Sequence, residues 1–83
     1  MPSIDTKLFF TRIACKDEAV IRITGIQNGN FILMADYESQ TYIHSKSDGK
    51  HIEYKDIQDI FRLIQLECLK TDIVVSLKNW ESR

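Results

Sequence analysis

Two histidines and a glutamate in the middle of the chain are the residues best suited to chemistry. His44, His51 and Glu53 could together bind a divalent cation or exchange protons near neutral pH, where imidazole titrates. Tyr42 shares the sequence parity of His44, which places both on one side of a strand. A metal site also needs an enclosing layer of hydrogen bonds, and a strand pair open to solvent does not supply one. We therefore expect a solvated polar face, with a partner-binding surface as the alternative, and we predict neither a metal site nor a catalytic site.

A β-hairpin is expected to position these side chains. Two β-forming segments, 40–46 and 50–54, flank an Asp-Gly dipeptide that can form a tight turn. With that dipeptide as the turn, Ile43 faces Tyr54, the apolar side chains share one face and the polar side chains share the other. A register shifted by one residue would mix the two sets. The sequence therefore predicts a one-sided hairpin with its polar face in solvent.

Three earlier segments are also β-forming. Segment 8–14 is rich in Phe, Thr and Ile, and segments 20–26 and 31–36 flank an Asn-Gly dipeptide, which favours a two-residue type I′ turn. With that turn, Ile26 opposes Phe31, and both faces of the hairpin carry mainly apolar side chains. We expect this hairpin to be central and covered on both sides.

One helix is predicted near the C-terminus, over residues 55–70. Asp56 can cap its first turn through a side-chain oxygen. The apolar stripe that recurs at i, i+3, i+4, i+7 and i+11 predicts one buried side, formed by Ile57, Ile60, Phe61, Ile64 and Cys68. The β-forming run at 73–77 then predicts a final strand.

These elements predict an α+β fold, in which a mainly antiparallel sheet of about five to six strands packs one α-helix. The 83 residues form a single domain, 1–83, with short polar tails at 1–6 and 79–83. No apolar run approaches the roughly 20 residues needed to cross a bilayer, and no targeting segment is recognisable. We expect a cytoplasmic protein with no membrane partner.

A second group of leucines lies on the opposite side of the predicted helix. At about 100° per residue, Leu66 is opposite the buried stripe, with Leu63 and Leu69 roughly 60° to either side. So short a chain has little protein with which to cover both sides of a helix. We therefore expect this ridge to contact another molecule, together with Arg62 and Trp80. The alternative is that a chain terminus folds over the ridge, with Trp80 as its cover.

The charge balance gives little support to nucleic-acid binding. Eleven basic and twelve acidic residues leave a net charge of -1, without the basic field that attracts a phosphate backbone. Phe9, Phe10, Arg12 and Arg22 could form a surface that stacks on bases, but large aromatic side chains in so small a domain are expected in the core.

No cofactor or enzyme signature is present. Cys15 and Cys68 form no Cys-x-x-Cys pair and are expected to be buried free thiols, and no phosphate-binding loop or nucleophile elbow occurs. The sequence predicts a non-enzymatic regulatory or accessory protein without a cofactor, which acts through protein–protein contacts as a homodimer or with another protein. A nucleic-acid-associated regulator, whose binding surface forms on dimerisation, is the alternative.

Overall fold

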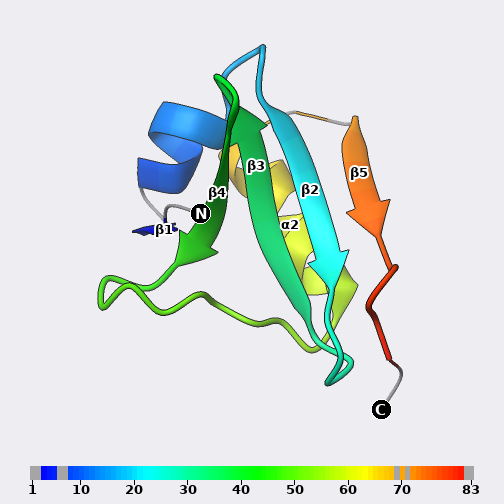
Figure 1. Ribbon diagram of the computed structural model, residues 1–83. Coiled ribbons are helices and arrows are strands. Elements are labelled where there is room, and N and C mark those ends of the chain that lie inside the picture. The colour runs from blue at the N-terminus through cyan, green and yellow to red at the C-terminus, as the bar shows by residue number, and fades with distance from the viewer. Residues whose placement is uncertain (1–2, 6–7, 69, 71, 82–83) are drawn as a thin grey trace.

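The computed structural model describes residues 3–5, 8–68, 70 and 72–81. In chain order the elements are β1 (Ser3–Asp5), η1 (Phe9–Ala14), β2 (Val20–Gly25), β3 (Phe31–Tyr37), β4 (Gln40–Ser45), α2 (Ile57–Glu67) and β5 (Ile73–Ser76). The helix α2 lies behind the sheet in Figure 1, and η1 lies beside β4. The fold is α+β, as predicted.

The sheet has the strand order β1-β4-β3-β2-β5. Strand β3 pairs antiparallel with β2 and with β4, whereas β1 runs parallel to β4 and β5 runs parallel to β2. The prediction of a mainly antiparallel sheet is therefore wrong. After α2 the chain enters β5, and β5 runs parallel to β2. The predicted five to six strands are not matched either. Four strands make the body of the sheet, and the three-residue β1, inside the expected polar tail at 1–6, adds to one edge.

Two predicted strands are not strands. Segment 8–14 forms the π-helix η1, in which the Cys15 N–H donates to the Phe10 carbonyl five residues earlier, at 3.2 Å. Its buried residues fall at i, i+1, i+4 and i+5, a helical stripe, so packing against the sheet overrides local β-propensity. Segment 50–54 makes only two isolated bridges, Ser45 with His51 and Phe31 with Tyr54.

The β2–β3 hairpin forms as predicted, but its register is shifted by one residue. Gly25, rather than Ile26, pairs with Phe31. Gly29 has φ of 84° and donates to the Ile26 carbonyl at 3.0 Å, which gives a three-residue loop whose last residue is left-handed. The shift places Ile23 opposite Leu33 on the core face and turns Arg22 and Thr24 to the other face. The predicted hairpin covered on both sides is therefore wrong.

The β3–β4 turn is a two-residue connection without glycine or asparagine. Tyr37 pairs with Gln40, and the intervening Glu38 and Ser39 have φ of 50° and 65°. Two successive left-handed residues define the type I′ turn that the Asn-Gly sequence led us to expect in the previous hairpin. The left-handed conformation is sterically unfavourable for residues with a Cβ, so pairing of the strands on either side stabilises this turn.

The core lies between the sheet and its two helices. Asp56 caps α2 by accepting from the Gln58 N–H at 2.9 Å, as predicted. Ile60 and Ile64 of the predicted stripe are fully buried, and the rest of the stripe packs around them. No helix among the described residues is long and apolar enough to cross a membrane.

Candidate functional site

The predicted polar face at the 40–54 hairpin is not formed as expected. Gly49 has φ of 87° and donates to the Lys46 carbonyl at 2.9 Å, so this loop also has three residues. Ser45 consequently pairs with His51, one residue out of the predicted register. His44 still shares a face with Tyr42, but that face is turned to the core and not to solvent. His44 is only 1% exposed.

An aromatic cage encloses the His44 ring. Its centroid lies 5.2 Å from that of Phe9 and 5.7 Å from that of Phe10, both in η1. Tyr54 stacks on it at 6.2 Å with an interplanar angle of 12°. Burial lowers the pKa of His44 from 6.5 to about 4, because an apolar cage disfavours the imidazolium. The ring is therefore neutral at physiological pH and stabilises the fold as a core aromatic.

His51 and Glu53 remain on the surface, where they connect two loops. His51 Nε2 lies 3.3 Å from Glu53 Oε2. Glu53 Oε1 also accepts from the side-chain amides of Asn28 and Asn30, each at 2.9 Å. Hydrogen bonds from Asn30 and Asn28 lower the pKa of Glu53. The carboxylate thus joins the 50–54 segment to the β2–β3 turn, and no three His, Cys, Asp or Glu residues of the described chain are grouped to hold a metal ion.

Of the described residues in the predicted leucine ridge, Leu66 is strongly exposed and Leu63 is not. Leu66 is 83% exposed, whereas Leu63 is half-buried against the core. Arg62 is exposed and lies 3.5 Å from Asp59 on the same helix, and Leu69 lies outside the described residues. Single exposed leucines are common on protein surfaces, so α2 alone gives weak support for an interface.

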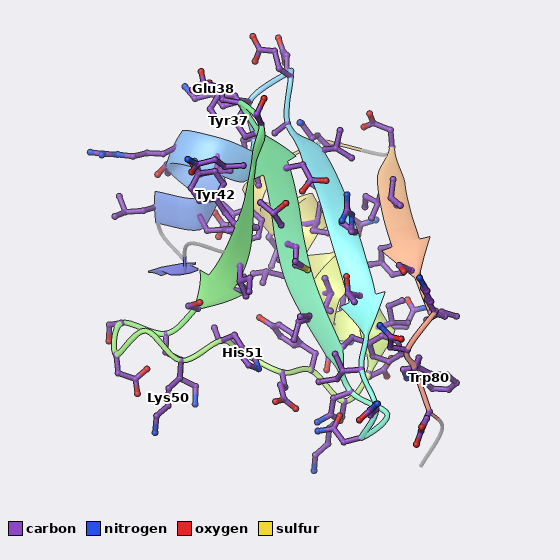
Figure 2. The ribbon with its side chains drawn as sticks, in the orientation of Figure 1. Tyr37, Glu38, Tyr42, Lys50, His51 and Trp80 are labelled. Carbon is purple, nitrogen blue, oxygen red and sulfur yellow. The ribbon has the colours of Figure 1, made fainter. Side chains whose placement is uncertain are left out.

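Trp80 covers the end of the sheet. Its ring stacks on Phe31 at 5.9 Å, and its indole N–H donates to the Gly29 carbonyl at 3.1 Å. A Cβ at Gly25 would lie 2.6 Å from Trp80 Cβ, so only glycine leaves room for this contact. Figure 2 shows Trp80 beside the β2–β3 turn. Trp80 therefore belongs to the folded domain, and Leu66 stays exposed.

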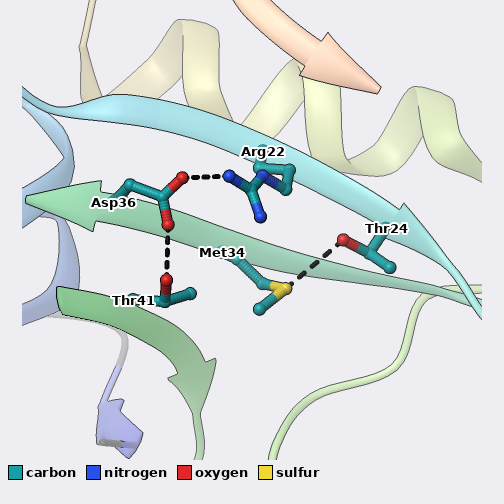
Figure 3. Close-up of polar contacts among 5 residues, drawn as sticks. All are labelled: Arg22, Thr24, Met34, Asp36 and Thr41. Carbon is teal, nitrogen blue, oxygen red and sulfur yellow. Dashed lines mark hydrogen bonds and ion pairs between the residues drawn. The ribbon is translucent and has the colours of Figure 1, made fainter. Parts of the chain in front are cut away.

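The uncovered face of the sheet carries a polar network that we did not predict (Figure 3). Arg22 donates to one carboxylate oxygen of Asp36, and the Thr41 hydroxyl donates to the other at 2.6 Å. The Thr24 hydroxyl contacts Met34 Sδ at 3.3 Å. Arg22 and Asp36 are fourteen residues apart, so only the correct hairpin register could have revealed this pair. The network compensates the charge of Arg22 within the chain.

The residues considered for base stacking and thiol chemistry are mainly structural. Phe9 and Phe10 are buried, as expected for core aromatics. Cys15 and Cys68 are free and half-buried, and the Cys15 thiol lies 3.4 Å from the Glu67 carbonyl. Burial and the neighbouring Cys68 thiol raise the pKa of Cys15 to about 12. Since the thiolate is the nucleophilic form, Cys15 is poorly suited to catalysis at neutral pH.

Strand β5 presents the most extended apolar surface. Val74, Val75 and Leu77 are 48%, 42% and 51% exposed. Figure 1 shows β5 at one edge of the sheet, and no described strand lies beyond it. The sequence signal was an uncharged β-forming run between Asp72 and Lys78, which predicted the strand but did not show that it would be an edge.

Comparison with known proteins gives no relative: no family model matches the chain, and neither a curated protein nor a solved structure is significantly similar to it. Function is therefore inferred from the chain's own residues.

Proposed function

We propose that this chain is a small non-enzymatic regulatory or accessory protein that acts through protein–protein contacts and associates with itself. The observation that carries the proposal is the exposed apolar edge strand β5. An edge strand presents a row of backbone N–H and C=O groups that can pair with another strand. Natural proteins usually protect such an edge with lysine, proline or a bulge, and β5 is the uncharged sequence Ile-Val-Val-Ser.

Domain size supports association. An 83-residue chain buries a smaller fraction of its surface on folding than a larger domain does, so a contact that removes further apolar side chains from water stabilises it. Leu66 and Arg62 on α2 form a second surface that a partner could contact. The nucleic-acid alternative has less support, because Arg22 is paired with Asp36 and Phe9 is buried.

The proposal is tested by measuring the solution mass with light scattering over a wide range of protein concentration, in moderate salt and with a thiol reductant. We expect a mass that rises from monomer to dimer with increasing concentration. A monomer at every concentration would contradict self-association and would direct the search to a different protein partner.

The role of the helix surface is tested with Leu66→Ala. Because Leu66 is 83% exposed, its truncation should change the free energy of unfolding by less than ~0.5 kcal/mol, and any weaker dimerisation is then a direct effect on the interface. Ile64→Ala is the matched control, since Ile64 is fully buried on the same helix and its truncation should cost about 2–5 kcal/mol. Unchanged dimerisation in Leu66→Ala would show that this surface of α2 does not contribute to the interface.

A further inference from the structure

We propose that β5 pairs antiparallel with the β5 of a second copy of this chain, about a two-fold axis at Val75. This inference rests on the proposed self-association and specifies its interface. The result is one continuous sheet through both subunits, with the free edge of each β5 removed.

Symmetry limits the registers that such a pairing can adopt. Residues directly opposed in an antiparallel pair have side chains on the same face of the sheet. A two-fold axis perpendicular to the sheet keeps the helix-covered faces of both subunits on the same side. The axis must then lie midway between a residue and its own copy on the facing strand, because opposed residues share a face whereas adjacent residues of one strand point to opposite faces. The uncharged run 73–77 is centred on Val75, so we compare the registers centred on Val74, Val75 and Ser76.

The register centred on Val75 matches apolar residues and opposite charges. Ile73 opposes the partner's Leu77 on the face that also carries Val75, so apolar pairs cover the centre of the interface. Asp72 and Lys78 flank β5, and Lys78 lies in the turn that the Trp80 N–H closes by donating to the Leu77 carbonyl at 3.1 Å. The antiparallel arrangement brings each Asp72 near the partner's Lys78, so opposite charges meet at each end of the interface. Both side chains are exposed, and neither makes an ion pair with any described residue of its own chain. Cross-strand pairs of both kinds stabilise a sheet.

The other two symmetric registers are less favourable. Centring on Val74 moves Asp72 opposite the partner's Ser76 and so separates it from the partner's Lys78. Centring on Ser76 places the apolar Val74 opposite the partner's Lys78. Charge complementarity therefore selects the Val75 register from the three.

The same register extends the existing core. Val75 is the neighbour of the fully buried Ile23, and Ile73 is the neighbour of the fully buried Ile21, across the parallel β2–β5 ladder. The opposed apolar residues therefore lie on the face that α2 covers. Their exposed surface becomes buried in the dimer, next to side chains that are already excluded from water.

The first test replaces Val75 with lysine. In the dimer the two introduced ammonium groups would oppose each other at the axis, and we expect the dimer dissociation constant to rise at least tenfold. Val20→Lys is the matched control, because Val20 is a strand valine that is 40% exposed against 42% for Val75, and it lies on β2 rather than on the free edge. Circular dichroism checks that both variants remain folded.

The second test exchanges the end charges. Asp72→Lys and Lys78→Asp should each weaken the homodimer roughly tenfold, because each replaces two opposite-charge contacts by two like-charge contacts. The double variant restores both pairs and should dimerise like the original chain. An equimolar mixture of the two single variants should form a heterodimer, since both of its end contacts join opposite charges.

The outcomes separate this register from self-association in general. Loss of dimer in Val75→Lys with retention in Val20→Lys, together with rescue by the charge exchange, supports the β5 interface. A dimer that persists in Val75→Lys overturns the β5 interface but leaves self-association intact. If Val75→Lys dissociates and the charge exchange gives no rescue, the Val75 register is wrong. A monomeric original chain contradicts both proposals.

Discussion

Replacing His44 with phenylalanine should remove most of the acid sensitivity that the core contributes. The imidazole is 1% exposed and enclosed by Phe9, Phe10 and Tyr54, so the folded protein holds it neutral. Its pKa is about 4 in the folded state, against 6.5 for the solvated side chain of the unfolded chain. Phenylalanine has a similar shape and no titratable group.

The sign and magnitude follow from the two pKa values. Below pH 6.5 the unfolded chain protonates His44 and the folded chain does not, so stability falls as the pH decreases through this window and levels off below pH 4. The difference between 6.5 and about 4, at about 1.4 kcal/mol per unit, corresponds to a loss of ~3 kcal/mol. At pH 4.5 the loss should already be about 2.5 kcal/mol relative to pH 7.

Urea denaturation at pH 7 and at pH 4.5, followed by the fluorescence of Trp80, measures this effect. The free energy of unfolding of the original chain should fall by about 2.5 kcal/mol more than that of His44→Phe, since carboxylates titrate equally in both proteins. His51→Gln is the control, because it removes the exposed histidine and keeps the buried His44, so the acid sensitivity that His44 contributes should remain. Equal pH dependence in the original chain and in His44→Phe would refute the assignment of His44 as a buried neutral imidazole.

Two further variants test the contact of Trp80 with Gly25 and the β3–β4 turn. Gly25→Ala should displace Trp80, because the added Cβ would lie 2.6 Å from Trp80 Cβ. We expect a loss of about 1–3 kcal/mol in the free energy of unfolding and a red-shifted tryptophan emission. Unchanged emission would contradict the contact. Glu38→Asn combined with Ser39→Gly should raise the free energy of unfolding by about 1–2 kcal/mol in urea denaturation. Both positions have positive φ, which Asn and Gly adopt more readily than Glu and Ser. A loss of stability would argue against strain in this turn.

Local patterns in the sequence were enough to predict several elements. The helix stripe and the Asp56 cap follow from contacts within a few residues, and α2 forms where the periodicity places it. Strands β2, β3 and β5 lie in the segments whose β-branched and aromatic residues predicted them. The burial of Ile60 and Ile64 follows from the same periodicity.

The tertiary structure decided which faces those elements present. In both glycine-containing hairpins a three-residue loop replaced the expected two-residue turn, and a shift of one residue moves every side chain to the opposite face of its strand. That shift buried His44, which sequence reasoning had placed in solvent.

Long-range packing also overrode local propensity. Segment 8–14 has strand-forming residues but folds as η1, because its aromatic side chains cover the core face of β3 and β4. The sequence by itself determined an α+β chain with a C-terminal helix and a β-forming run after it. Only the tertiary structure made β5 a free edge, because strand order depends on contacts between residues far apart in sequence, which local periodicity does not encode.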